Sequence, residues 1–119
     1  MKKLLISLVL IVGFYSCNIQ PNKEVYQGKE AAPIIMRIEN DKSLYHFSYT
    51  GIYMNQEAYY DIYFDKEKNI MYRVIAAKEK DEDGSRKTLV EVHKNINFDR
   101  EYSKEYLKQK EGDARIKQN

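Results

Sequence analysis

Alternating apolar and polar residues dominate the middle of the chain and predict β-strands. The alternation has a period of two, so every second side chain points to the same face of a sheet. It is present in five segments, at residues 34–38, 44–50, 59–64, 70–77 and 88–98. In the segment 70–77 both faces are largely apolar, which is typical of a central strand covered on both sides. Gly51 is expected to end or bulge the second strand, and the last strand reaches residue 98 only if no bulge interrupts it.

Residues 99–112 have the pattern of a helix instead. Asp99 can act as the N-cap, and Gly112 suits the position after the last turn, near which lysines gather. Two tyrosines four residues apart add a narrow apolar stripe. The remaining residues, 113–119, are expected to be a frayed tail.

The order of these elements predicts a fold class. Successive strands with short connections are antiparallel, and Asp83-Gly84 is a strong signal for one such hairpin. We expect a mainly β, or α+β, domain over residues 34–112: a small antiparallel sheet of about five strands, a meander or open barrel, with one C-terminal helix. Residues 18–33 are polar and contain both prolines, which predicts a flexible tether, although a short strand could form around Val25.

The first seventeen residues have the pattern of an export signal. Lys2 and Lys3 form a positive start, and the segment Leu4 to Phe14 carries no charge. Eleven residues match the apolar core of a signal peptide and fall well short of the roughly 20 that a membrane-spanning helix needs.

The segment Phe14-Tyr15-Ser16-Cys17, which contains the only cysteine of the chain, resembles the lipobox of bacterial lipoproteins. Phe14 and Tyr15 depart from the usual aliphatic and small residues, as in the relaxed lipoboxes of small spirochaetal surface lipoproteins, to which the chain is similar in composition. The resemblance implies cleavage after Ser16 and attachment of diacylglycerol to Cys17. Two or more acyl chains hold a protein stably on a bilayer. A free thiol in an ordinarily secreted protein is the alternative.

Location and charge follow from this resemblance. The lipoprotein likeness implies a cell-envelope protein that is lipid-anchored to the outer membrane, with exposure at the cell surface as one outcome. Two of the 20 basic residues lie in the leader, and the other 18 balance the 18 acidic residues of the mature chain. A neutral domain argues against nucleic acid as a partner, because phosphate binding requires a basic surface.

Candidate metal and catalytic chemistry is sparse. The acidic loop that starts at Glu79 matches the first positions of a calcium-binding loop, but Val90 stands where the bidentate carboxylate belongs. His46 and His93 could form a zinc site only with a carboxylate such as Asp61 or Glu91 as a third ligand. No nucleophile or phosphate-loop motif is present in the sequence, so we expect no enzyme activity, no metal and no cofactor.

Tyrosine is the most conspicuous residue type, with eleven in the chain and no tryptophan. Tyrosine gives a large contact area for little lost side-chain entropy and is enriched at recognition surfaces. We therefore take four tyrosines of the second and third strands as a candidate binding patch: Tyr49, Tyr53, Tyr59 and Tyr63. The alternative is that tyrosine fills a half-buried pleat because of its strand propensity.

These patterns favour a membrane-anchored lipoprotein whose domain binds an unidentified protein and catalyses no reaction. A periplasm-facing accessory or inhibitor lipoprotein is the alternative. Such a protein would block an envelope enzyme with a loop such as Glu79 to Ser85.

Overall fold

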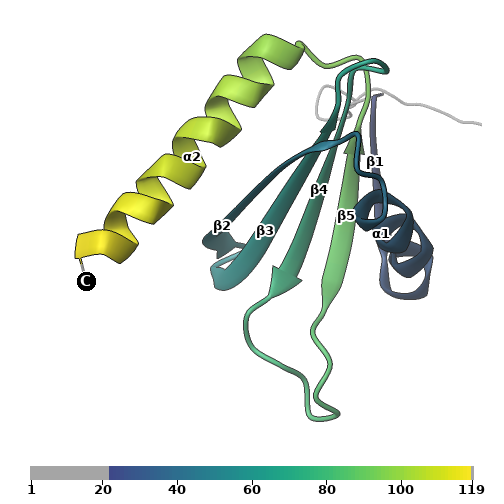
Figure 1. The fold of residues 1–119 in the computed structure, drawn as a ribbon. Coiled ribbons are helices and arrows are strands. Elements are labelled where there is room, and N and C mark those ends of the chain that lie inside the picture. Colours follow the sequence, from purple (N-terminus) through teal and green to yellow (C-terminus); the bar gives the residue numbers. More distant parts are fainter. Residues whose placement is uncertain (1–21, 119) are drawn as a thin grey trace, which may run out of the picture.

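Residues 22–118 are described by a computed structural model, which contains one five-stranded antiparallel sheet with a helix on each face (Figure 1). The elements are β1 (Lys23–Gln27), a 3₁₀ turn (Gly28–Glu30), α1 (Ala31–Glu39), β2 (Tyr45–Tyr53), β3 (Gln56–Asp65), β4 (Ile70–Ala77), β5 (Thr88–His93) and α2 (Phe98–Gln118). The strand order is β1-β5-β4-β3-β2, and every neighbouring pair is antiparallel. The predicted class, an antiparallel sheet with a C-terminal helix, is confirmed, and the sheet is open.

The two faces of the sheet carry separate hydrophobic cores. β4 is the central strand, as its apolar pattern predicts. Its side chains Tyr72 and Val74 join the core beneath α1, whereas Met71 and Ile75 join the core beneath α2. All four are buried, which explains why this segment is apolar on both faces.

The N-terminal part of the domain differs from the prediction. Residues 23–33 are not a tether, because β1 and the start of α1 belong to the folded domain. Residues 34–38 are not a strand either, since they lie in α1. Ala31, Ile34, Ile35 and Ile38 follow the helical spacing of three and four residues and face the sheet. Over so short a segment, a period of two and a period of 3.6 fit the same apolar residues.

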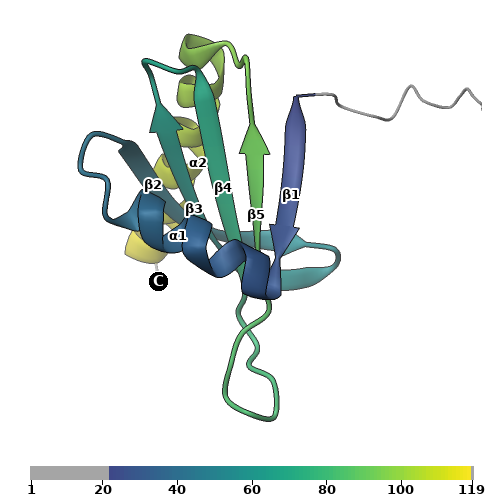
Figure 2. The ribbon, with the colours of Figure 1, turned by 90° about the vertical axis from the view of Figure 1, so that its right-hand side faces the viewer.

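Helix α1 connects the two edges of the sheet. β1 pairs with β5 and β2 pairs with β3, so the chain must cross one whole face between β1 and β2. Figure 2 shows α1 lying across the strands. The register places the start of β1 at the same end of the sheet as the β3–β4 turn. The β2–β3 turn and the β4–β5 loop lie at the opposite end, which we call the hairpin end.

Strands β2 and β3 are longer than predicted, and a two-residue turn joins them. Gly51 neither ends nor bulges β2, because the strand continues to Tyr53. A Cβ at Gly51 would lie 3.0 Å from a ring carbon of Tyr60, so glycine allows a close approach here. β5 ends at His93, and Asn95 has a positive φ of 54°. The chain therefore changes face after β5, and Ile96 packs in the core beneath α2.

Helix α2 packs on the second face, over β2 and β3. Its N-cap is Asn97, not the predicted Asp99: Asn97 Oδ1 accepts a hydrogen bond from the backbone N–H of Arg100 at 3.2 Å. The predicted end at Gly112 is wrong, because the helix continues through the expected tail to residue 118. A Cβ at Gly112 would lie 3.8 Å from Cβ of Tyr49, so this glycine lies against β2.

Aromatic rings form the contact between α2 and the sheet. The ring of Tyr102 lies 5.0 Å from Phe47, 5.8 Å from Phe64 and 5.2 Å from Phe98, measured between ring centroids. Such tilted and edge-on arrangements are the favourable ones for aromatic pairs. The helix also covers the free edge of the sheet, since the side chain of Gln109 accepts a hydrogen bond from the backbone N–H of Ser48 in β2 at 2.7 Å.

Candidate functional site

A mainly apolar cavity of about 900 Å³ opens at the hairpin end of the sheet, and we call it the hairpin cavity. It lies where the β2–β3 turn, the β4–β5 loop and the start of α1 meet. Its apolar lining includes Ala31, Ile35, Tyr53, Ile75 and Leu89. The volume falls in the range of roughly 300–1,000 Å³ that is usual for ligand sites.

Exposed apolar side chains gather at the hairpin end of the sheet. Met54 at the tip of the β2–β3 turn lines it and is 80% exposed, and Ile52 and Tyr59 next to the turn are 63% and 37% exposed. The guanidinium of Arg86 lies 5.4 Å above the Tyr59 ring. Exposed apolar residues that gather at one end of a domain are typical of an interaction site.

The backbone of this turn is strained. Met54 and Asn55 both have positive φ values, 50° and 67°. Turns of this shape favour Asn, Asp or Gly at both positions, and a left-handed conformation costs other residues roughly 1–2 kcal/mol. A methionine that is exposed and strained is therefore unfavourable for the fold itself.

A second hollow, of about 360 Å³, lies between α2 and strands β2 to β4, and we call it the arginine pocket. Arg73 of β4 lines it together with Tyr49, Tyr60 and Lys108. The Nε atom of Arg73 is buried and has no hydrogen-bond partner among residues 22–112, whose side chains the structure describes. A buried unsatisfied donor costs about 1–3 kcal/mol.

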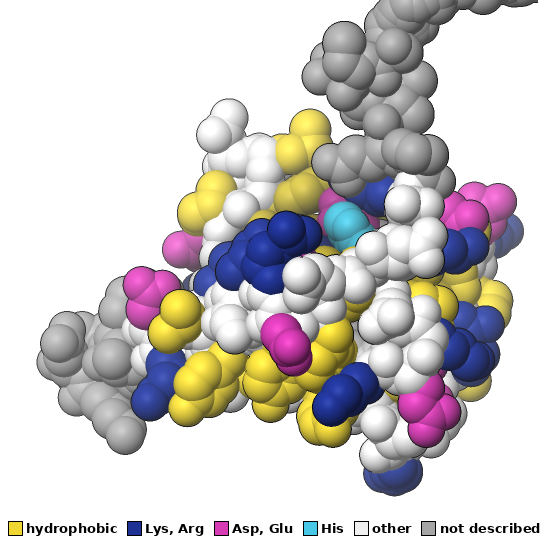
Figure 3. Space-filling view, turned by 90° about the horizontal axis from the view of Figure 1, so that it is seen from above, with side chains coloured by type: hydrophobic (Ala, Val, Ile, Leu, Met, Phe, Trp, Pro, Cys, Tyr) yellow, Lys and Arg dark blue, Asp and Glu magenta, His cyan; other side chains and the backbone are white. Residues whose placement is uncertain are grey.

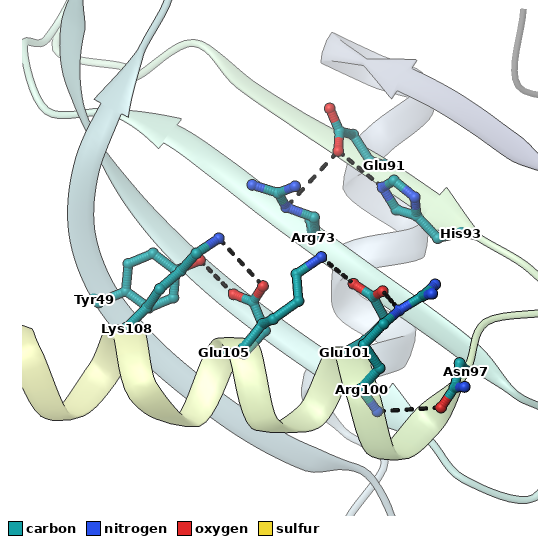
Figure 4. Close-up of polar contacts among 10 residues, drawn as sticks. Tyr49, Arg73, Glu91, His93, Asn97, Arg100, Glu101, Glu105 and Lys108 are labelled. Atoms are coloured by element: carbon teal, nitrogen blue, oxygen red, sulfur yellow. Dashed lines mark hydrogen bonds and ion pairs between the residues drawn. The ribbon is translucent and has the colours of Figure 1, made fainter.

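Two buried carboxylates lie close to the arginine pocket (Figure 4). Glu91 of β5 is 7% exposed; its Oε1 lies 2.9 Å from Nε2 of His93 and 3.8 Å from Nε of Arg73. The Nζ of Lys23 in β1 is 3.8 Å from the other carboxylate oxygen. The bond to His93, helped by the charges of Arg73 and Lys23, holds the pKa of Glu91 below its usual range although burial acts the other way.

The other carboxylate, Glu105 of α2, is only 2% exposed. The hydroxyl of Tyr49 donates a hydrogen bond to it, and Nζ of Lys108 lies 3.4 Å from its second oxygen (Figure 4). Burial and this carboxylate raise the pKa of Tyr49 far above its ordinary value, so the phenol stays protonated. The contact joins α2 to β2 through a charged hydrogen bond.

The two histidines lie on opposite faces of the sheet and do not converge. His93 contacts Glu91 beneath α2, whereas Nε2 of His46 lies 2.8 Å from Oδ1 of Asp61 on the α1 side. Among the described side chains, those of residues 22–112, no group of three or more His, Cys, Asp or Glu is placed to hold a metal ion.

A serine completes the exposed cluster around His46 without forming a nucleophilic triad. Oγ of Ser48 donates a hydrogen bond to Oδ1 of Asp61 at 2.5 Å, the same oxygen that His46 approaches. In a Ser-His-Asp triad the histidine lies between the other two, with a different ring nitrogen toward each. Here serine and aspartate are bonded directly, so no relay through the histidine is formed.

The four candidate tyrosines do not form one patch. The register places Tyr49 and Tyr53 on the α2 side and Tyr59 and Tyr63 on the α1 side. Tyr53 lines the hairpin cavity, Tyr59 contacts Arg86 of its lining, and Tyr49 lines the arginine pocket. Tyr63 is 8% exposed and stacks on His46, 4.3 Å between ring centroids, so it belongs to the packed structure.

Sequence reasoning missed Met54 and Arg73. Each carried a weak signal: Met54 precedes Asn55 in what proves to be a two-residue turn, and Arg73 interrupts an otherwise apolar strand.

The leader, Ser16 and Cys17 lie outside the described residues. Between residues 22 and 118, neither helix combines the length and the apolar character needed to cross a bilayer. No protein-family model, no curated protein and no solved structure matches the chain.

Proposed function

We propose that the protein is a lipoprotein of the cell envelope, anchored in the outer membrane through Cys17, whose domain binds another protein and catalyses no reaction. The leader, the cysteine that follows it and the likeness to a lipobox support the anchor. The hairpin cavity and the exposed apolar side chains at the hairpin end support the binding role.

The observation that carries this proposal is the placement of the hairpin cavity relative to the point where the chain enters the domain. The chain enters at Lys23, which pairs with His93, and the cavity lies at the other end of β1, where Gln27 pairs with Leu89. Figure 2 shows β1 running from the entry point to the start of α1. A domain held at its entry point presents the hairpin cavity away from the anchor.

The chain between anchor and domain is short. Six residue steps separate Cys17 from Lys23, and a fully extended chain of that length spans about 20 Å. An acylated Cys17 would therefore hold the entry end of the domain near the lipid surface. Figure 3 shows that end of the molecule, where basic and acidic side chains are interspersed with apolar ones. A mixed surface of this kind suits contact with a headgroup layer without strong attraction to one sign of charge.

The chemistry of the hairpin end indicates an apolar recognition surface. Methionine is flexible and polarizable and adapts to partners of different shape. Met54 occupies a position whose backbone favours Asn or Gly, which is expected where binding outweighs local stability. Tyr59 and Arg86 beside it are of the residue types enriched at binding hot spots.

A capture experiment tests the binding role. The fragment from Asn18 onward retains both cores and serves as bait for an envelope extract. Met54→Asn should reduce recovery of the partner at least about tenfold, the usual effect of losing one hot-spot side chain. Met36→Asn removes another exposed methionine, 64% exposed on α1, and should leave recovery unchanged. Equal recovery with both variants contradicts binding at the hairpin end.

One observation favours the second candidate, an inhibitor or accessory protein that faces the periplasm. The β4–β5 loop projects from the sheet (Figures 1 and 2). Oδ1 of Asp83 accepts hydrogen bonds from the backbone and hydroxyl of Ser85, which fixes the loop tip. Protease treatment of intact cells separates the two candidates: surface display predicts loss of the domain, and a periplasm-facing protein predicts full protection.

A further inference from the structure

The arginine pocket is separate from the hairpin cavity and has a different chemistry. Its floor is formed by two tyrosines, Tyr49 and Tyr60, whose rings stack at 5.2 Å with an interplanar angle of 13°. A positive side chain lies over each ring: Arg73 is 5.6 Å from Tyr60, and Lys108 is 5.9 Å from Tyr49. Two aromatic rings are thus combined with two cations in a hollow of about 360 Å³.

The neighbouring carboxylates leave Arg73 incompletely satisfied. Glu91 lies 3.8 Å from Nε of Arg73, beyond hydrogen-bond distance, and is bonded to His93 instead. Glu105 accepts the hydroxyl of Tyr49 and pairs with Lys108. The guanidinium is a fork of five donors that matches a carboxylate in two parallel hydrogen bonds.

We propose that the arginine pocket binds the carboxylate of a ligand that carries a flat apolar group, with Arg73 holding the carboxylate and the stacked tyrosines contacting the flat group. Three acidic side chains, Glu91, Glu105 and Glu111, surround the two cations. With Lys23 beside Glu91, three cations balance these three carboxylates, so the pocket has no excess of positive charge to hold a doubly charged phosphate, and a singly charged carboxylate suits it better. The ammonium group of Lys108, on α2, attracts the carboxylate of the ligand.

Gly51 makes room for this ligand. It lines the pocket, and its φ is not positive, so alanine is compatible with the backbone there. A Cβ at this position would lie 3.0 Å from Cε1 of Tyr60 and would displace the ring. Gly51→Ala therefore reshapes the floor of the pocket and leaves every charge in place.

The test uses the full chain in detergent micelles, with amide chemical shifts recorded by NMR during titration with benzoate. Benzoate should shift residues of β2, β4 and α2 around the pocket, and neutral benzamide or inorganic phosphate should not. Arg73→Lys keeps the positive charge but loses the planar guanidinium, which can donate two parallel hydrogen bonds to a carboxylate. It should therefore weaken benzoate binding at least about tenfold. Arg37→Lys, a matched change on an exposed arginine of α1 that lines neither hollow, should alter the affinity less than about twofold.

The carboxylate could belong to a free acid or to the C-terminus of a peptide. N-acetyl-glycyl-phenylalanine, compared with its C-terminal amide, distinguishes the sources: tighter binding of the acidic peptide than of benzoate assigns the site to a chain terminus, and the reverse assigns it to a small acid. Absence of shifts with both acids, or equal binding by Arg73→Lys and the unaltered protein, overturns the proposal. Gly51→Ala should weaken both acids several-fold, and unchanged affinity would also contradict it. These outcomes do not depend on capture at the hairpin end.

Discussion

The hydrogen bond between Tyr49 and Glu105 fixes α2 against the edge of the sheet, so its loss should be costly. Glu105 is 2% exposed, and after Tyr49→Phe only Lys108, 3.4 Å away, contacts its carboxylate. Hydrogen bonds to charged groups contribute about 1.5–3 kcal/mol, and a buried acceptor without a partner costs a similar amount. We expect the free energy of unfolding to fall by about 2 kcal/mol, which lowers the thermal midpoint of a domain of this size by about 10 °C.

The assay is urea unfolding of the fragment from Asn18, followed by far-ultraviolet circular dichroism. Tyr53→Phe is the matched control, because it removes a hydroxyl on the same face of the same strand about 13 Å from Tyr49. Its free energy of unfolding should stay within about 0.5 kcal/mol of that of the unaltered fragment. If Tyr49→Phe were no more destabilising than Tyr53→Phe, the contact would not hold the helix.

Two further predictions concern α1 and the buried ion cluster. Ile38→Ala should cost about 2–5 kcal/mol because Ile38 is 2% exposed, whereas Met36→Ala should cost under about 0.5 kcal/mol; equal costs in urea unfolding would favour the strand interpretation, in which both residues share a face. Glu91 has a lowered pKa, chiefly through His93, so its ionised form stabilises the fold above pH 4.5, and that contribution is lost as the pH falls through the lowered pKa. Thermal midpoints measured from about pH 6 to pH 3 should therefore fall less steeply for Glu91→Gln than for Glu57→Gln, which removes an exposed carboxylate; parallel curves would refute this role.

Much of the sheet could be predicted because its signals are local. A strand that is apolar on both faces must be central, and residues 70–77 are. Asp83-Gly84 marks a turn whichever partner strands it joins. The class of fold follows from such signals, since each depends on a few neighbouring residues.

The rest required information that neighbouring residues do not carry. Five residues around Met36 fit a strand or a helix equally, and only the sheet that α1 covers decides between them. The grouping of Tyr49 with Tyr59 failed because the register of β2 against β3 puts them on opposite faces. The arginine pocket depends on three strands and a helix that meet in space, so no single spacing in the sequence predicts it.

The most direct test of the anchored binding domain is the mass of its native N-terminal peptide. Protein extracted from the outer membrane and digested with trypsin should yield the peptide Cys17–Lys23 with a diacylglyceryl group on the sulfur. An unmodified thiol at Cys17, or a peptide from an uncleaved leader, would contradict the account, because neither holds the entry end of the domain on the bilayer by acyl chains.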